Sequence, residues 1–249
     1  MSLPCPACGV TPRVGASFCA SCGTPLQLTQ GGSTIPDRRR AQIAPERAKG
    51  GLLLGLFVYA SFLIFGLIGI VLEVSIADLW IYDLASLAVT ILGLAKLGGE
   101  SLSHLAWPRF SLRGSAQALG ALALAVISAH LLLAIWPLNE SIRLLYEFEA
   151  LSIERALLDF CVIAPILEEL AFRGVILSAL GRAFDRGASV LLTAFLFATI
   201  HLSPISFLHL FLVGLVCGHL RLRSGSIYPS ILAHSGYNLA IVLIDWYWL

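Results

Sequence analysis

The chain has 249 residues, of which 58% are hydrophobic and only 12% are charged. Soluble domains carry about 25% charged residues, so this composition excludes an ordinary soluble protein and predicts a polytopic membrane protein. The net charge of +1 gives no reason to expect a nucleic-acid partner.

The first predicted unit, residues 1–27, is rich in cysteine. It contains two Cys-x2-Cys pairs separated by ten residues: Cys5 and Cys8, then Cys19 and Cys22. Two such turns can present four thiolates to one ion in tetrahedral geometry, so the segment predicts a structural zinc ribbon whose folding depends on the metal. A set of redox or disulfide cysteines is the alternative. Because four sulfurs leave no open position for catalysis, we expect a structural role or a docking site for a protein partner.

The rest of the chain predicts a basic linker followed by membrane helices. Residues 28–49 are polar and contain Gly, Pro and five basic side chains. Beyond them we expect about seven transmembrane helices, with six or eight as alternatives. The hydrophobic segments are 51–73, 77–98, 113–137, 156–181, 188–203, 205–221 and 226–247. We divide them into N-terminal helices with a loop, 50–150, and a C-terminal helical core, 151–249. The predicted fold class is an all-α polytopic membrane protein with a small zinc ribbon.

Basic residues mark one side of the predicted topology. They gather before the first span, after the second, and in the 182–186 and 221–223 connections, whereas the 138–155 loop combines two Arg with four Glu. By the positive-inside rule, the N-terminus and the ribbon are expected in the cytoplasm and the C-terminus outside. The expected setting is a prokaryotic cell membrane, because the chain joins a cytoplasmic zinc ribbon to a membrane core without eukaryotic targeting signals.

The span 156–181 contains two adjacent carboxylates and a guanidinium, Glu168, Glu169 and Arg173. A charge at the centre of a membrane helix costs about 2.5–3.5 kcal/mol on insertion scales, so these residues need partners, water or a function. Glu169 and Arg173 have the i,i+4 spacing of a pair on one helix face, whereas Glu168 is turned away and is freer to face a cavity. Pro165 removes one backbone hydrogen bond and should kink the helix.

Two further polar motifs lie in the later spans. Phe197-x3-His201 lies near the end of the fifth span, and His234-x3-Asn238 lies in the last, where i,i+4 spacing projects both polar side chains from one face. A carboxylate and an imidazole can together deprotonate a water and later protonate a leaving amine. A second imidazole and an amide can donate hydrogen bonds to an oxyanion. A structural polar network between helices is the simpler alternative. Of the other histidines, only His209 is placed where it can approach this site.

The motifs EExxxR, FxxxH and HxxxN, in this order on successive membrane helices, resemble those of the CPBP family. That family comprises the CAAX prenyl endopeptidases and the bacteriocin-processing or self-immunity (Abi) proteins. The resemblance covers roughly residues 150–245. It implies that Glu168 is the catalytic glutamate, that His201 helps it to activate water, and that His234 and Asn238 form the oxyanion site.

The same resemblance assigns Glu169 and Arg173 a structural or electrostatic supporting role. It implies an all-helical membrane core that encloses a conical cavity open to the cytosol. The implied function is an intramembrane endopeptidase that cuts a peptide or protein substrate at the lipid bilayer. The family has often been called metalloproteases. Because the chain has no HExxH motif, and because asparagine suits hydrogen bonding better than zinc ligation, we favour a glutamate-activated water without a required metal, with zinc as the alternative.

Two alternatives come from other functional classes. The first is a non-catalytic membrane scaffold or immunity protein that uses the same polar cavity to bind a peptide. The second is a transporter, because intramembrane Glu and His also serve in proton relays. The absence of a visible sequence repeat disfavours the transporter.

The zinc ribbon can be tested on the purified chain. We expect about one zinc ion per chain, because the four thiolates complete one tetrahedral site. Elemental analysis should show that Cys19→Ser loses most of this zinc, whereas Cys161→Ser, which changes a cysteine of a predicted membrane span, keeps it. Equal zinc contents in the two variants would contradict the ribbon.

Overall fold

The structure of the chain is a computed structural model. It describes residues 38–72, 80–98, 152–204 and 206–248, together with four single residues between 105 and 127. The four cysteines of the predicted zinc ribbon and nearly all of the predicted span 113–137 lie outside the described residues. The chain divides into two compact units, Met1–Ala44 and Pro45–Leu249, and the description below concerns the second. Every regular element within the described ranges is a helix.

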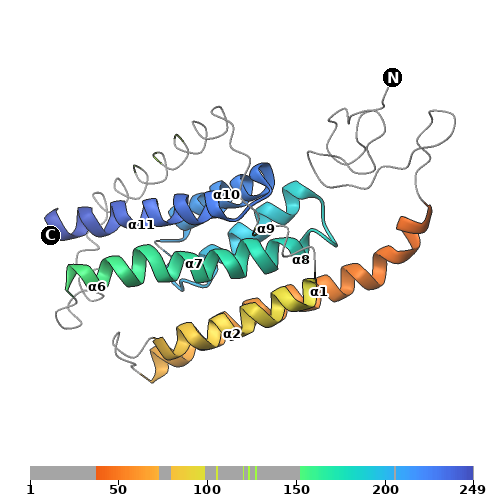
Figure 1. The fold of residues 1–249 in the computed structure, drawn as a ribbon, viewed down its shortest axis with the longest axis horizontal. Coiled ribbons are helices and arrows are strands. Elements are labelled where there is room, and N and C mark those ends of the chain that lie inside the picture. Colours follow the sequence, from red (N-terminus) through yellow and green to blue (C-terminus); the bar gives the residue numbers. More distant parts are fainter. Residues whose placement is uncertain are drawn as a thin grey trace. The chain divides into compact units, whose positions relative to one another are not determined.

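One continuous helix carries the paired glutamates (Figure 1). Ser152 begins it, because its side-chain oxygen accepts a hydrogen bond from the backbone N–H of Arg155. Along its length α-helical and π-helical segments alternate: α6 (Ile153–Leu158), η3 (Asp159–Ile163), α7 (Ala164–Glu169), η4 (Leu170–Ile176) and α8 (Leu177–Leu180). A π-turn places one extra residue in a helical turn, and such turns are frequent at functional sites. The two glutamates therefore end a short α-segment that has a π-segment on each side.

The backbone disturbance expected at Pro165 takes the form of η3. At its end the backbone N–H of Ala164 bonds to the carbonyl of Asp159, five residues earlier. The same pattern continued by one residue would need an N–H at position 165, where proline has none. The helix nevertheless continues, and the N–H of Leu170 bonds to the carbonyl of Ile166 in the ordinary α-helical way.

Three later helices surround this element: α9 (Arg186–Thr199), α10 (Phe207–Ser224) and α11 (Tyr228–Trp248). α9 begins at Asp185, whose carboxylate accepts a hydrogen bond from the N–H of Ala188 at 3.0 Å. α10 ends at Gly225, whose φ of 70° lies in the left-handed region that glycine adopts without strain. α10 packs against α9 and α11, and α11 runs beside α6, η3 and α7 (Figure 1).

The first two helices, α1 (Arg38–Val71) and α2 (Trp80–Leu97), pack against the same core. α2 contacts α7 and η4. Gly93 permits this approach, because a Cβ there would lie 2.9 Å from Val175 of η4 and 3.2 Å from Val58 of α1. Val58 and Val175 are both fully buried. The three helices thus meet at one tight apolar crossing.

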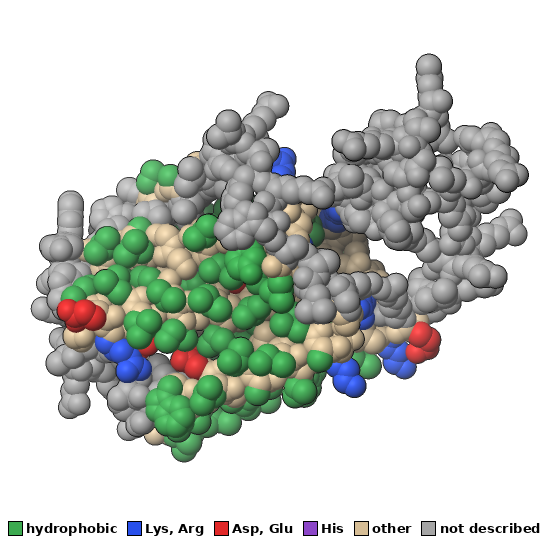
Figure 2. Space-filling model, in the orientation of Figure 1, with side chains coloured by type: hydrophobic (Ala, Val, Ile, Leu, Met, Phe, Trp, Pro, Cys, Tyr) green, Lys and Arg blue, Asp and Glu red, His purple; other side chains and the backbone are tan. Residues whose placement is uncertain are grey.

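The surface of this unit suits a bilayer. Hydrophobic side chains cover most of the described face drawn in Figure 2, and large apolar residues such as Leu53, Ile91 and Leu232 have more than half of their surface exposed. Three helices within the described ranges are long and apolar enough to cross a membrane: Ala48–Val71, Trp80–Leu97 and Phe207–Ser224. These correspond to the first, second and sixth predicted spans, so the chain is an integral membrane protein.

The fourth, fifth and last predicted spans are also helical, but their bounds differ from those predicted. The fourth, 156–181, is the composite helix that ends at Leu180, and the fifth, 188–203, is the shorter apolar helix α9, which ends at Thr199. The last, 226–247, corresponds to α11. An all-helical membrane protein is therefore confirmed, whereas the count of seven spans stays a prediction.

The crossing of α9 and α10 can be tested at Gly214. A Cβ added there would lie 2.8 Å from the backbone Cα of Ala194, so we expect Gly214→Ala to destabilise the fold by about 1–3 kcal/mol. At Gly66, which is exposed and has nothing within 4 Å of an added Cβ, alanine should be neutral or stabilising by up to about 1 kcal/mol. Thermal unfolding of the two variants in detergent makes the comparison, and equal melting temperatures would contradict the tight crossing.

Candidate active site

The centre of the site is a fully buried ion pair between Glu169 and Arg173. Nη1 of Arg173 lies 2.7 Å from Oε1 of Glu169, and both side chains have no exposed surface. This is the i,i+4 pair that the helix spacing predicts. A buried charge is stable only when it is paired and hydrogen-bonded, so each of the two groups depends on the other.

The guanidinium of Arg173 also contacts the neighbouring helices. Its Nη2 donates a hydrogen bond to the carbonyl of Gly214 at 3.0 Å, and its Cζ lies 4.7 Å from the ring centroid of Phe197. The first contact reaches α10 and the second reaches α9. Arg173 therefore joins its own helix to α9 and α10 at one point. Gly214 takes part in this junction through its carbonyl oxygen.

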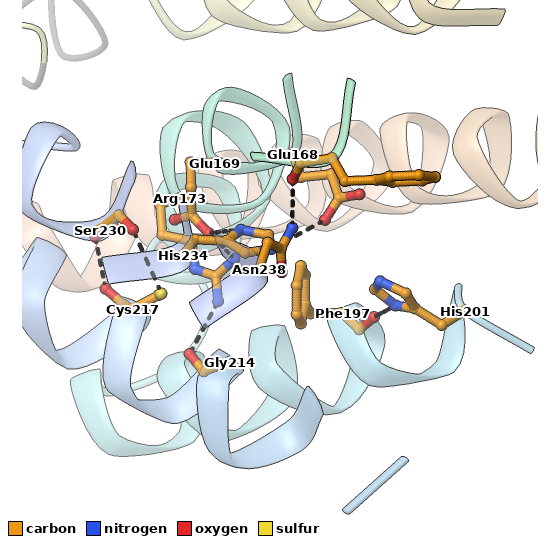
Figure 3. Close-up of polar contacts among 11 residues, drawn as sticks. Glu168, Glu169, Arg173, Phe197, His201, Gly214, Cys217, Ser230, His234 and Asn238 are labelled. Carbon is orange, nitrogen blue, oxygen red and sulfur yellow. Dashed lines mark hydrogen bonds and ion pairs between the residues drawn. The ribbon is translucent and has the colours of Figure 1, made fainter. Parts of the chain in front are cut away.

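His234 of α11 lies between the two glutamates (Figure 3). Its Nδ1 is 3.1 Å from Oε1 of Glu169, and its Nε2 is 3.8 Å from Oε2 of Glu168. Because the Glu169 carboxylate already accepts a hydrogen bond from Arg173, it is the ionised partner, and Nδ1 of His234 must carry the hydrogen. Nε2 is then the atom that is available for chemistry on the side of Glu168.

Glu168 differs from its neighbour in exposure and in bonding. The side chain of Glu168 is 21% exposed, whereas that of Glu169 is 0% exposed. Oε2 of Glu168 accepts no hydrogen bond from any described residue. Oε2 of Glu169 also lacks a hydrogen-bond partner among the described residues, so the two carboxylates differ in that Glu169 is fully buried and held by Arg173, whereas Glu168 is partly exposed and is not.

The ring of Phe197 separates the two histidines (Figure 3). It meets His201 edge-on at 5.1 Å between centroids, and it meets His234 in the same way at 5.3 Å. Nδ1 of His201 lies 2.8 Å from the Phe197 carbonyl, which can only accept, so Nδ1 carries the hydrogen and Nε2 is the basic nitrogen of the neutral ring. Within the described residues His201 has no hydrogen bond to Glu168, and its side chain is exposed.

Asn238 is bound to the backbone of the glutamate helix. Its Nδ2 donates a hydrogen bond to the carbonyl of Phe160 at 2.7 Å. That carbonyl is the one that position 165 would satisfy if the π-pattern of η3 continued, and Pro165 has no hydrogen to donate. Asn238 thus supplies the missing donor from α11. The second amide hydrogen of Asn238 stays available for another acceptor.

The structure therefore brings together most of the predicted set, but in unequal ways. Direct contacts connect Glu168, Glu169, Arg173 and His234, and His201 adjoins them through Phe197, whereas Asn238 bonds to the backbone of Phe160, one turn or more before the glutamates on the same helix. Sequence reasoning missed the contributions of the Phe197 ring and of the Gly214 carbonyl. The phenylalanine of FxxxH was a visible indication of the first, whereas no local pattern indicates which backbone carbonyl accepts from Arg173.

No group of three His, Cys, Asp or Glu side chains in the described part of the chain is arranged to hold a metal ion. Glu168 and His234 are the two groups that could contribute ligands from the centre of the site. The expectation that a glutamate activates the water without a metal, with zinc as the alternative, stays a prediction.

Residues 151–240 match the protein family described as Type II CAAX prenyl endopeptidase Rce1-like. The matched segment includes all six predicted active-site residues. Comparisons with curated proteins and with solved structures found no match. The chain thus contains a domain of the CAAX prenyl endopeptidase family, which is a family of proteases, and the resemblance seen in the three motifs is confirmed at that level.

The role of Asn238 as a donor to the Phe160 carbonyl can be tested with a double-mutant cycle. We expect Asn238→Ala to destabilise the wild-type chain by about 1 kcal/mol, because it leaves that carbonyl unpaired. In a Pro165→Ala background the new N–H at position 165 can take over, so the same substitution should cost less. Thermal unfolding of the four proteins measures the coupling, and equal costs in both backgrounds would contradict the proposed link.

Proposed function

We propose that the chain is an intramembrane endopeptidase in which Glu168 activates a water for attack on a peptide bond. One observation carries this proposal. Glu169 is fully buried and its Oε1 binds both Arg173 and His234, whereas the side chain of Glu168 is 21% exposed and its Oε2, which accepts no hydrogen bond from a described residue, lies 3.8 Å from an imidazole nitrogen. A group available for proton transfer next to a fixed counter-charge is the arrangement that general acid–base catalysis needs.

The hydrolysis follows from the proton positions. Glu168 takes a proton from a water while the water oxygen forms a bond to the carbonyl carbon of the substrate. When the carbon–nitrogen bond breaks, Glu168 returns that proton to the leaving amine, so that the two products are a free carboxyl and a free amino terminus. The basic Nε2 of neutral His201 can accept a hydrogen bond from the same water, which is the assisting role assigned to it from the family resemblance.

The oxyanion formed in this reaction needs hydrogen-bond donors. Nε2 of His234 donates only when the ring carries both hydrogens, and the carboxylate of Glu169, 3.1 Å from Nδ1, supplies the counter-charge for that imidazolium while Glu168 holds the proton taken from the water. The amide hydrogen of Asn238 that is not bonded to Phe160 is the second donor in this scheme. Arg173 has a supporting role, because its charge keeps Glu169 ionised and in place.

The proposal extends to the setting of the reaction. A protease acts on peptide or protein substrates, and the apolar helices put this one in the bilayer, so the scissile bond belongs to a membrane-associated segment. We further propose that the protein lies in a prokaryotic cell membrane, because a zinc ribbon is joined to a membrane core without eukaryotic targeting signals. The distribution of basic residues favours an N-terminus in the cytoplasm. The four cysteines of the ribbon would bind zinc, and the ribbon would dock a protein partner.

A peptide-binding scaffold or immunity protein is the competing function. The occupied Glu169–Arg173–His234 network favours it in one respect, because a network of this kind also fixes helices without chemistry. The partial exposure of the Glu168 side chain favours catalysis, because a water can reach this carboxylate but cannot reach the fully buried Glu169. The two functions therefore differ in what they require of this single carboxylate.

Removal of the Glu168 charge separates these functions. Glu168→Gln keeps the shape of the side chain, so we expect it to unfold at nearly the wild-type temperature while peptide cleavage by the purified protein falls by about 10²- to 10⁴-fold. Glu154→Gln, which changes an exposed carboxylate at the start of α6, is the matched control and should cleave normally. Full cleavage by Glu168→Gln would rule out its assignment as the base. If no protein cleaves peptide but Glu168→Gln complements a deletion strain, the scaffold is favoured.

A further inference from the structure

The first membrane helix reaches the active-site region although it lies outside the matched residues 151–240. The hydroxyl of Tyr59 in α1 is 3.0 Å from Oγ1 of Thr199, the last residue of α9. His201 follows two positions later. The contact joins residues 140 positions apart, so it belongs to the tertiary fold rather than to local helix structure.

The direction of this hydrogen bond is fixed by its surroundings. The hydroxyl of Thr199 donates its single hydrogen to the carbonyl of Leu196 at 2.9 Å. Its oxygen can then act only as an acceptor toward Tyr59, so the phenol donates. Phenylalanine at position 59 would remove this donor without changing the size of the ring.

The segment that Tyr59 contacts has a strained backbone. α9 ends at Thr199, and Leu202 has a φ of 52°, the one positive value at a residue other than glycine in the described ranges. Its N–H bonds to the carbonyl of Thr199 at 3.2 Å. A leucine adopts the left-handed conformation only when its surroundings require it. His201 therefore lies just beyond the C-terminal end of α9, between the residue held by α1 and a strained residue.

A second contact supports the same side of the site. The ring of Phe62, one turn after Tyr59, meets Phe172 edge-on at 6.1 Å between centroids. Phe172 in turn meets Phe197 at 5.3 Å, and Phe197 contacts His201 and His234. α1 is thus joined to the histidines by one hydrogen bond and by a continuous series of aromatic contacts.

From this geometry we infer that Tyr59 is a positioning residue, which holds the C-terminal end of α9 so that His201 keeps its place beside Phe197. The inference rests on the proposed peptidase function, because the value of a fixed His201 lies in its hydrogen bond to the attacking water. It assigns α1 a part in catalysis in addition to its role as a membrane span.

The test compares two hydroxyl deletions on one helix in the full-length protein. Tyr59→Phe removes the bond to Thr199. Ser61→Ala removes a hydroxyl that bonds only within α1, to the carbonyl of Phe57 at 2.9 Å. Two quantities are measured for each variant: hydrogen–deuterium exchange of the peptides that cover residues 196–206, and kcat and KM for peptide cleavage.

For Tyr59→Phe we expect faster exchange in 196–206 and a kcat lower by about three- to tenfold with KM nearly unchanged, because one net hydrogen bond is lost from an element that acts in the transition state. Ser61→Ala should match the wild type in both. In a His201→Ala background, Tyr59→Phe should lower kcat no further, because the residue through which it acts is absent.

These outcomes distinguish a failure of the positioning role of Tyr59 from a failure of the proposed peptidase function. Unchanged exchange and unchanged kcat in Tyr59→Phe overturn the positioning role. A further fall of kcat in the His201→Ala background also overturns it, because Tyr59 would then act through another residue. Faster exchange in a protein whose wild type cleaves no peptide supports the contact between α1 and α9 and counts against the proposed peptidase instead.

Discussion

The buried carboxylate of Glu169 is the constraint on which the rest of this structure depends. It has no exposed surface and binds both Arg173 and His234, so it fixes α11 against the glutamate helix. Arg173 extends the same contact to α10 through Gly214 and to α9 through Phe197. Removal of charged groups from water is costly unless their partners are in place, so the four helices must meet at this point before any of them is stable there.

The chemistry of the site depends on the imidazole nitrogens that are not bonded within this network. Since Glu169 takes Nδ1 of His234, the opposite nitrogen of the ring faces Glu168. The carbonyl of Phe197 orients His201 in the same manner, with its basic nitrogen away from the helix. In each case a fixed acceptor decides which side of an imidazole is free to react. The reactive groups are thus set by bonds made to other residues, not by contacts among themselves.

Spacing in the sequence predicted part of this arrangement. The i,i+4 pair of Glu169 and Arg173 could be read directly, because it lies within one helix, and the order of the three motifs indicated the family. The bond from Asn238 to Phe160 could not be read, since it depends on how α11 lies against a π-helical segment. The hydrogen bond between Tyr59 and Thr199 has the same origin, because no local pattern tells which of many apolar faces α1 covers. Asn238 can therefore serve the predicted oxyanion role with only one of its two amide hydrogens, because the other is bonded to the backbone carbonyl of Phe160.

The two π-segments have a consequence for how this region tolerates insertion and deletion. A π-turn accommodates one more residue than an α-turn, so a chain with one residue fewer in η3 could return to regular α-helix without losing its length across the bilayer. The residues before the deletion would keep their orientation relative to Glu168 and Glu169, whereas a regular α-helix that kept every residue would turn them by about 100°. In that second case α6 would turn a different side toward the core, while the glutamates kept their places. The π-turn in η3 therefore keeps the packing side of α6 and the charged motif of α7 in a fixed relation although the helix contains one residue more than a regular α-helix would allow.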